Sequence, residues 1–323
     1  MFKKVHYCSF HFLKKIKKYY IICKNGERRY RDKIYKIGKM AVIIDGKSLA
    51  KKTRENLKIE CEKLKDKGII PKLAVIMVGD DPASKVYVRN KSKACDEIGV
   101  KYEEYILKDS ITQKELIDLI HKLNEDKTVN GILLQSPIPN HLDIDEAFRE
   151  ISSEKDVDGF NPVNIGKLLL NQDTFVSCTP YGIMKMFEEY NIDLEGKNLV
   201  IIGRSNIVGK PLMACCLNNH ATVTVCHSRT KGLKEKTKNA DILIAAIGKS
   251  KFITADMVKE GAVVIDVGIN RGEDKKLTGD VDFEEVKKKA SYITPVPGGV
   301  GPMTIAMLMN NVSRRPSGLR KTR

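Results

Sequence analysis

The sequence predicts an α/β protein built from two wound α/β domains, the second of them Rossmann-like. Apolar strand-like runs alternate with amphipathic helix-like segments along most of the 323 residues, a pattern typical of parallel sheets covered by helices. Residues 199–202 form one such run, and Gly203 and Gly209 follow it. A strand, a glycine turn and a helix N-terminus together form the anion site of dinucleotide-binding folds. Because Ser205 occupies the place of the usual middle glycine, an ordinary βα turn remains the alternative on the glycines alone.

Most of the predicted strands are apolar runs. The first predicted helix, which ends at Gly68, has Leu49, Leu57, Cys61 and Leu64 along one face. The strands expected in chain order are 72–78, 101–107, 129–135, 199–202, 221–226, 241–246, 262–266 and 291–294. Helix ends are predicted from capping residues, namely Ser84 (N-cap) and Gly99 (stop), Thr112 and Glu115 (a capping box), and Thr179 and Pro180 (cap and first position).

Two segments are predicted to be rigid loops. At 136–139, two prolines two positions apart take the chain out of its sheet. At 295–302, three glycines and three prolines fall within eight residues, which favours a stiff loop that approaches a ligand closely. A plain connection is the alternative for the second loop.

The net charge of +16 lies entirely at the two ends of the chain. Residues 1–39 hold thirteen basic and two acidic residues, and residues 313–323 hold five basic residues and no acid, so residues 40–312 are neutral overall. A groove that follows nucleic-acid phosphates needs its positive charge on the folded body. We therefore expect no nucleic-acid partner for the body.

The eight cysteines are scattered, with no C-x-x-C pair. This usage indicates reduced cytoplasmic thiols rather than a disulfide framework, and predicts no metal site. No apolar run reaches the length of a membrane span, so no membrane partner is expected.

The expected domain organisation has four parts. Residues 1–39 form a basic N-terminal extension, either a disordered arm or a gene-model artefact upstream of Met40. Residues 40–176 form a catalytic domain, on which a closing helix at 303–312 packs back. Residues 177–302 form the Rossmann domain. Residues 313–323 form an atypical basic tail, because Pro316 is expected to end the helix.

The end of the strand at 221–226 predicts the cofactor. Enzymes that hold NAD place an acid there for the ribose 2′-hydroxyl, whereas Ser228 and Arg229 occupy this position, and Arg204 lies in the glycine turn. Guanidinium and hydroxyl groups suit a 2′-phosphate. The sequence therefore favours NADP, with two solvated surface arginines as the alternative.

Four polar residues of the first half are candidates for chemistry. Tyr87 and Lys91 lie four apart on one predicted helix face, and a lysine serves as an acid or base near neutral pH only when its pKa is lowered. Gln135 ends a strand, and Asp158 lies in a polar interdomain link. Taken singly, the alternatives are a surface pair, an edge amide and a turn carboxylate.

An ordered series of motifs carries a family resemblance. The motifs are YVRNK (87–91), GILLQSPIP (131–139), KDVDGF (155–160), CTP (178–180), GRSNIVGKP (203–211), DVGIN (266–270), GDV (279–281) and TPVPGGVGPMT (294–304). The chain resembles the bifunctional methylenetetrahydrofolate dehydrogenase/methenyltetrahydrofolate cyclohydrolase family over roughly residues 42–310. It departs from the usual pattern at Ser136, where leucine is common, and in the tail.

The resemblance implies an enzyme of one-carbon metabolism. It would oxidise 5,10-methylenetetrahydrofolate with NADP⁺ and hydrolyse the methenyl product to 10-formyltetrahydrofolate, as a homodimer. Lys91 would be the general acid/base, Gln135 would hydrogen-bond it, Tyr87 would stack on the aminobenzoate ring, and Asp158 would hold the pterin. The residues implied to hold NADP are Gly203, Arg204, Ser205, Ser228, Arg229 and Ile269. The residues implied to line the folate side of the cleft are Pro297, Gly298, Gly299, Val300 and Gly301.

Two other functions stay open from the sequence. A dehydrogenase without cyclohydrolase activity is one, although intact Tyr87, Lys91 and Gln135 argue against it. A non-enzymatic protein that binds a partner through the basic arm is the other. Deletion of residues 1–39 would separate the basic-arm function from catalysis.

Overall fold

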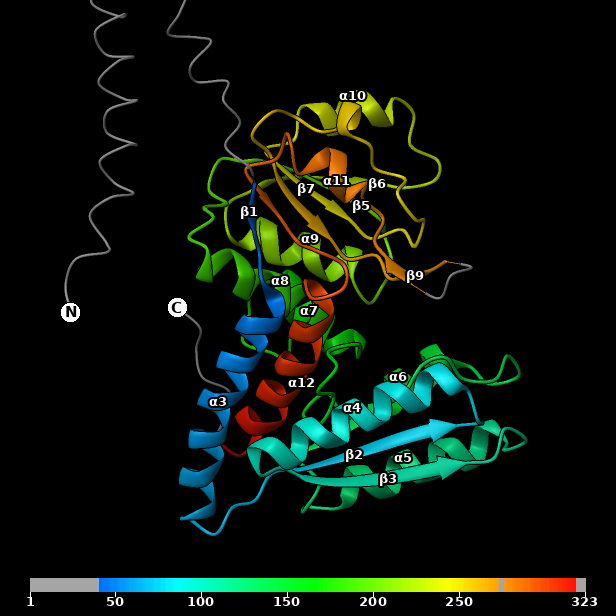
Figure 1. Ribbon diagram of the computed structural model, residues 1–323. Coiled ribbons are helices and arrows are strands. Elements are labelled where there is room, and N and C mark those ends of the chain that lie inside the picture. Colours follow the sequence, from blue (N-terminus) through cyan, green and yellow to red (C-terminus); the bar gives the residue numbers. More distant parts are fainter. Residues whose placement is uncertain (1–40, 273–275, 318–323) are drawn as a thin grey trace, which may run out of the picture. The chain divides into compact units, whose positions relative to one another are not determined.

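The computed structural model describes residues 41–272 and 276–317 of the chain. The expectations for 1–39 and for the tail beyond Ser317 lie outside these residues. The described part forms two parallel α/β sheets with helices around them (Figure 1). No helix within 41–272 or 276–317 is long and apolar enough to cross a membrane.

The first lobe contains a three-stranded parallel sheet in the order β3-β2-β4. Its elements are α3 (Gly46–Lys65), β2 (Lys72–Val78), α4 (Pro82–Ile98), β3 (Lys101–Leu107), α5 (Gln113–Glu125), β4 (Gly131–Leu134) and α6 (Ile144–Glu150). The central strand β2 is apolar from Leu73 to Val78 because helices cover both faces. Alternate residues from Leu73 pack toward α4, and those from Ala74 pack toward α5.

The second lobe contains a six-stranded parallel sheet in the order β1-β11-β8-β7-β5-β6. Its strands are β1 (Val42–Ile43), β5 (Asn198–Ile202), β6 (Thr222–Cys226), β7 (Ile242–Ala245), β8 (Val263–Asp266) and β11 (Tyr292–Ile293). Its helices are α7 (Pro162–Leu169), α8 (Cys178–Glu189), α9 (Gly209–Asn218), α10 (Leu233–Lys238), η3 (Ala255–Met257) and α11 (Phe283–Val286). A separate antiparallel pair joins β9 (Asn270–Arg271) to β10 (Leu277–Thr278).

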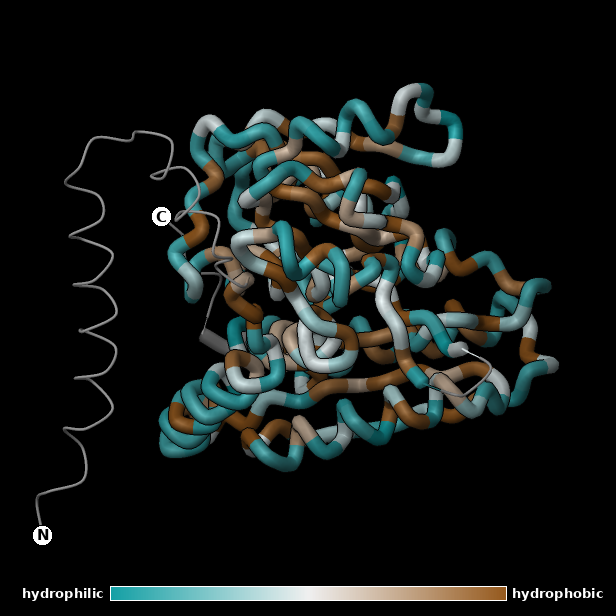
Figure 2. Tube along the Cα trace, turned by 45° about the horizontal axis from the view of Figure 1, so that its top comes forward, coloured by the Kyte–Doolittle hydropathy of each residue, from teal (hydrophilic) through white to brown (hydrophobic). Residues whose placement is uncertain are grey.

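Two long helices lie side by side and join the cores of the two sheets. Helix α12 (Val300–Ser317) packs on α3, α8 and α4 (Figure 1). One continuous cluster of buried residues includes Val75 of β2, Ile201 of β5 and Met303 of α12. Figure 2 shows hydrophobic stretches along the interior strands and hydrophilic residues over the outer helices and loops. The two lobes therefore share much of their hydrophobic core.

The start of the first predicted domain requires a correction. Val42 and Ile43 do not join the first sheet but pair in parallel with Tyr292 and Ile293 of β11, at the edge of the second sheet. The chain then crosses through α3 into the first lobe. A two-residue strand gives too little periodicity in the sequence to show which sheet it joins.

Helix starts also differ from the prediction. Asp81, not Ser84, is the N-cap of α4, with Pro82 in the first turn; the Asp81 carboxylate accepts the Ser84 backbone N–H at 2.7 Å. Helix α8 begins at Cys178, so Thr179 and Pro180 lie inside its first turn, where a missing N–H costs no helical hydrogen bond. The capping box of Thr112 and Glu115 and the left-handed stop at Gly99 are confirmed.

The closing helix is longer at both ends than the expected 303–312. It begins at Val300, inside the predicted loop, and continues to Ser317, past Pro316. Its later turns are fixed by tertiary contacts, since Arg314 pairs with Asp173 at 2.9 Å. Residues 313–317 therefore belong to the folded body rather than to a tail.

Candidate functional site

Helix α4 carries Tyr87 and Lys91 one turn apart, and Lys91 faces the end of β4. The Lys91 Nζ donates to Gln135 Oε1 at 2.9 Å. The Gln135 Nε2 donates to the Ser136 carbonyl oxygen at 2.5 Å. Because the amide nitrogen is engaged in this way, the amide oxygen is the atom offered to the lysine. This contact uses the backbone of Ser136, so the serine side chain at that departure from the family pattern does not affect it.

Asp158 and Cys178 complete the surroundings of Lys91. Burial lowers the pKa of the Lys91 amine, although the Asp158 charge opposes the shift. Burial also raises the pKa of the Asp158 carboxyl, opposed by Lys91 and by a hydrogen bond from Cys178. The pKa of the Cys178 thiol is raised by the same burial. Loss of hydration thus outweighs the attraction between the charges and shifts each pKa in the direction that disfavours the charge.

The backbone beside Asp158 is held from α12. The Val157 carbonyl oxygen accepts Asn311 Nδ2 at 2.8 Å and Cys178 Sγ at 3.4 Å. Asn311 Nδ2 also donates to the Val176 carbonyl oxygen at 3.1 Å. A fully buried amide therefore ties the polar link at 154–162 to the start of α8 and fixes the position of Asp158.

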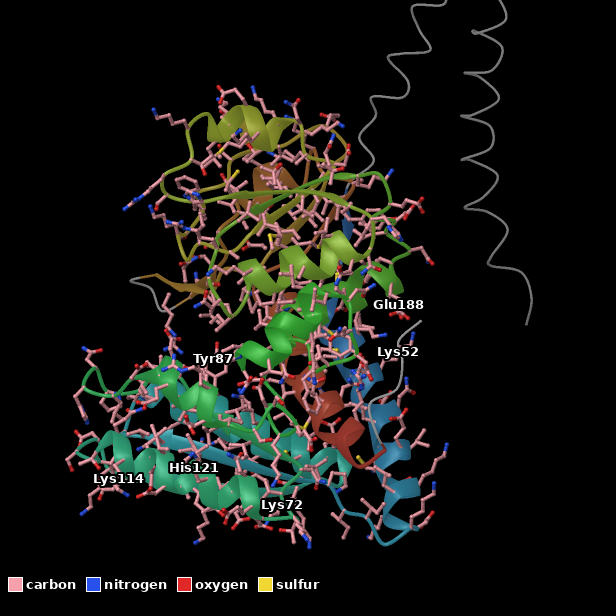
Figure 3. The ribbon with its side chains drawn as sticks, turned by 180° about the vertical axis from the view of Figure 1, so that it is seen from behind. Lys52, Lys72, Tyr87, Lys114, His121 and Glu188 are labelled. Carbon is pink, nitrogen blue, oxygen red and sulfur yellow. The ribbon has the colours of Figure 1, made fainter. Side chains whose placement is uncertain are left out.

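Tyr87 lines a hollow between α4 and the start of α12. Its side chain is 43% exposed and borders a cavity of about 370 Å³ with Asn90, Gly301, Pro302 and Ile305. Figure 3 shows Tyr87 on α4 near the edge of the first lobe. An exposed ring beside a cavity offers a flat apolar surface to a ligand.

The loop at 295–302 and Ile269 share a second hollow. They line a cavity of about 170 Å³ at the ends of β8 and β11. The Gly298 carbonyl oxygen accepts the backbone N–H of Lys47 at 2.9 Å, which attaches the loop to the first turn of α3. Ile269 is 48% exposed here, so an apolar side chain is available to a ligand.

The glycine turn lies where the winding of the second sheet reverses. Strand β5 has β6 on one side and β7 on the other, and ligands of such sheets bind at this point, beyond the carboxyl ends of the strands. Gly203 has φ +128°, and a Cβ there would lie 2.2 Å from the Ala246 carbonyl oxygen. Only glycine allows the turn to approach the end of β7 so closely.

The other predicted cofactor residues surround this turn. Ser205 Oγ accepts the backbone N–H of Val208 at 3.2 Å and so supports the start of α9. The side chains of Arg204, Ser228 and Arg229 are exposed at the ends of the neighbouring strands β5 and β6. No Asp or Glu follows β6 before residue 235. A space that only glycine permits, flanked by two exposed guanidinium groups and a hydroxyl, fits a dinucleotide with a 2′-phosphate.

The predicted residues thus form two groups. Lys91, Gln135 and Asp158 come together at the end of the first sheet, and Tyr87 lies one turn away on α4. The glycine turn, Ser228, Arg229 and Ile269 lie at the carboxyl edge of the second sheet.

The structure further includes Cys178, Asn311, Asp266 and Asp280, to which the sequence analysis assigned no role. Cys178, Asp266 and Asp280 lie in the motifs at 178–180, 266–270 and 279–281. Their presence in these motifs is the feature of the sequence that could have singled them out.

Within the described residues, no group of His, Cys, Asp or Glu side chains is arranged to hold a metal ion. The described cysteines Cys61, Cys95, Cys178, Cys215, Cys216 and Cys226 are all buried and free.

Comparisons with known proteins agree with this geometry. The family described as tetrahydrofolate dehydrogenase/cyclohydrolase, catalytic domain, matches residues 44–158, and its NAD(P)-binding domain matches residues 177–317. The bifunctional protein FolD of Campylobacter hominis is 57% identical over 269 residues, which cover 83% of this chain and 95% of that protein.

Two solved structures are similar throughout. The bifunctional FolD enzyme of Campylobacter jejuni is 54% identical with a TM-score of 0.85, covering 86% of this chain and 99% of that one. The Trypanosoma brucei enzyme, complexed with NADP cofactor and inhibitor, is 35% identical with a TM-score of 0.82, covering 87% and 99%. Both domains are matched, and more than half of the aligned residues are identical to those of a relative that is covered to 95% of its length; the chain therefore belongs to the tetrahydrofolate dehydrogenase/cyclohydrolase family.

Proposed function

We propose that the chain is a bifunctional enzyme of one-carbon metabolism. It oxidises 5,10-methylenetetrahydrofolate to 5,10-methenyltetrahydrofolate with NADP⁺ and hydrolyses this product to 10-formyltetrahydrofolate, a one-carbon donor for biosynthesis. The hydrogen bond between Lys91 Nζ and Gln135 Oε1, at 2.9 Å in poorly hydrated surroundings, carries the proposal. It provides an amine whose pKa is lowered by burial, as a lysine that acts as an acid or base in catalysis requires.

In the cyclohydrolase step, Lys91 acts as the acid/base. The neutral amine takes a proton from water as the water oxygen bonds to the carbon between N5 and N10. The resulting ammonium donates its proton to N5 as the bond from that carbon to N5 breaks. The new hydroxyl on the carbon then loses its proton through the regenerated amine to solvent, which leaves the formyl group on N10. Gln135 accepts a hydrogen bond from Lys91 in both states, so it orients the amine without adding a charge that would raise its pKa.

The remaining folate contacts follow from chemistry and position. Asp158 accepts the amino and ring N–H donors of the pterin, since a carboxylate offers two acceptor oxygens. Tyr87 stacks on the aminobenzoate ring from its exposed position on α4. Pro297, Gly298, Gly299, Val300 and Gly301 line the same cleft from the second lobe. The first lobe with α12 is thus the folate side, and the sheet edge within 177–302 is the NADP side.

In the dehydrogenase step the chain supplies position rather than a strong base. The lone pairs of N5 and N10 stabilise the cation that forms on the folate, and NADP⁺ supplies the hydride acceptor when bound. Gly203 and Ser205 shape the turn for the pyrophosphate, and Arg204, Ser228 and Arg229 hold the 2′-phosphate. Ile269 contacts the cofactor from the end of β8.

An absorbance assay of the purified chain with 5,10-methylenetetrahydrofolate tests the proposal. We expect rapid NADPH formation, little reduction of NAD⁺, and a methenyl product that does not persist. Lasting accumulation of methenyl product would show a dehydrogenase without the cyclohydrolase step. No reduction of either cofactor would contradict the proposal altogether.

We further propose that the enzyme works as a homodimer in the cytoplasm. The buried free thiols of the described residues support a reducing compartment, and the dimer is an expectation from the family. Sedimentation of the purified chain at micromolar concentration is expected to give twice the mass of 36.3 kDa. A single-chain mass at that concentration would contradict the dimer.

A further inference from the structure

Two buried carboxylates at the edge of the second sheet have no part in the chemistry above. Asp266 ends β8 and is 3% exposed, and Asp280 follows β10 and is 0% exposed. Both carboxylates accept hydrogen bonds from backbone N–H groups, and Asp280 also accepts one from a side-chain amide. A buried carboxylate is tolerated only when such donors replace its lost hydration.

Asp266 joins the loop after β8 to the segment around Asp280. Its carboxylate accepts the backbone N–H of Gly268 at 3.0 Å, of Asp280 at 2.9 Å and of Val281 at 2.9 Å. Its own backbone N–H donates to Thr294 Oγ1 at 2.7 Å. Thr294 directly precedes the loop 295–302, so Asp266 also fixes the base of that loop.

Asp280 continues the connection to the loop after β7. Its carboxylate accepts three consecutive backbone N–H groups, those of Ile247 at 2.7 Å, Gly248 at 3.0 Å and Lys249 at 2.8 Å. Asn270 Nδ2 donates to the same carboxylate at 3.0 Å. A single side chain therefore sets the path of residues 247–249.

The sequence around the two carboxylates leaves room for them. A Cβ on Gly268 would lie 2.2 Å from Asp280 Oδ1, and a Cβ on Gly279 would lie 1.8 Å from Asp266 Oδ2. Side chains at either glycine would displace the carboxylates. Thr294, Asp266 and Asp280 thus form a close-packed chain of hydrogen bonds, called the relay below.

The loop that Asp280 fixes borders the dinucleotide turn. Its first residue, Ala246, is the one whose carbonyl oxygen excludes any side chain at Gly203. The ends of β5 and β7 form the two sides of the point where the sheet winding reverses. A shift of residues 246–249 would therefore alter the space that the cofactor occupies.

We propose that Asp280 is a positioning residue for the dinucleotide, acting through the backbone of residues 247–249, and that Asp266 supports it from the next loop. The inference rests on the proposed function only in naming NADP as the ligand. Neither carboxylate acts on the folate, and Lys91 has no part in the relay.

The test is Asp280→Asn, which keeps the shape of the side chain but turns one acceptor oxygen into a donor that faces an N–H. We expect the Kd of NADP⁺, measured by calorimetry, and the KM of NADP⁺ to rise about tenfold or more. The affinity for NAD⁺ is expected to fall by a similar factor, since the loop does not read the 2′-phosphate. Hydrolysis of added methenyltetrahydrofolate without cofactor is expected to stay within about twofold of the parent.

Asp282→Asn is the matched control, because it makes the same change two positions away, where the side chain does not cap α11. We expect it to leave NADP⁺ affinity unchanged. If Asp280→Asn does not fold, Asn270→Ala removes the side-chain donor to Asp280, together with a long hydrogen bond of 3.4 Å to the Thr278 carbonyl oxygen. It is expected to give a smaller rise in the Kd of NADP⁺ with the same pattern.

Unchanged NADP⁺ affinity in a folded Asp280→Asn would overturn the inference. An equal loss of both activities would do so too, because that result means general destabilisation rather than loop positioning. A parent chain that does not bind NADP⁺ at all would instead contradict the proposed function.

Discussion

Buried polar groups are satisfied in opposite ways at the two halves of the site. Around Lys91, the amine and the Asp158 carboxyl contact side chains and have few donors or acceptors, so burial moves both pKa values toward the neutral forms. At the edge of the second sheet, the Asp280 carboxylate accepts three backbone N–H groups and an amide. Burial still raises the pKa of Asp266 to about 6, opposed by its three N–H donors.

The difference in how the buried groups are hydrogen-bonded fits two different tasks, proton transfer at Lys91 and loop positioning at Asp280. A group that exchanges a proton must have both protonation states within reach, so poor solvation is useful at Lys91. A group that holds a loop must keep one geometry, so full satisfaction by N–H donors is useful at Asp280. The folate side is therefore built for proton transfer, and the NADP side is built for fixed position.

The largest expected effect comes from removing the amine. Lys91→Met is expected to lower the cyclohydrolase rate by about 10²–10⁴-fold, because no other group at this position takes up the proton. NADP⁺ binding is expected to be unchanged, and methenyl product should accumulate during the oxidation. Lys114→Met, which removes an exposed lysine on α5, is the control for loss of charge. Undiminished 10-formyl product from Lys91→Met would refute the role of this lysine.

On the NADP side, Arg204→Ala combined with Arg229→Ala removes both guanidinium groups near the end of β6. We expect the KM for NADP⁺ to rise by about 10–100-fold and the KM for NAD⁺ to change little, since charge-assisted bonds to a phosphate are strong. Steady-state kinetics with both cofactors measures the ratio. An equal rise for NAD⁺ would contradict recognition of the 2′-phosphate by these residues.

Removal of the buried amide that supports Asp158 tests the link between the lobes. Asn311→Ala is expected to lower the free energy of unfolding by about 2 kcal/mol, because the Val176 carbonyl oxygen loses the hydrogen bond from Asn311. Urea denaturation measures the change. Asn310→Ala, one position earlier on the same helix, is the control and should cost less, because its amide contact with Tyr181 is long at 3.5 Å. Equal losses would show that Asn311 has no special role.

The smallest expected effect is a shift in the pH dependence of the cyclohydrolase rate, and it is the prediction most specific to Lys91. The amine acts as a base only when neutral, so the cyclohydrolase rate should rise with pH and level off above its lowered pKa. In Gln135→Glu a carboxylate would stabilise the ammonium and raise that pKa. We expect the rate at neutral pH to fall and the plateau to move to higher pH. A pH profile identical to that of the parent would contradict the contribution of Gln135.

The sequence predicted those features that depend on local pattern. Strand β2 occupies the expected residues 72–78, because a strand buried on both faces is a continuous apolar run. The spacing of Tyr87 and Lys91 placed them on one helix, and the glycine turn was found at 203–209. These signals lie within one or two turns of chain.

The missed features depend on contacts between distant segments. β1 joins β11 across about 250 residues, and Asp280 reaches a loop more than thirty residues earlier. Helix α12 extends past the expected end because Asn311 and Arg314 are held by the 157–176 segment. The helix ends one residue after Pro316, so the proline marks its end later than expected. Neither periodicity nor composition reports such pairings.

The most direct test of the contrast between the two regions is the pKa of Lys91 itself. NMR of the chain with isotope-labelled lysine side chains, with the signal assigned by its loss in Lys91→Arg, follows this amine against the exposed lysines. The account predicts that Lys91 titrates well below them and moves back toward them in Gln135→Glu. A Lys91 signal that titrates together with the exposed lysines would contradict it.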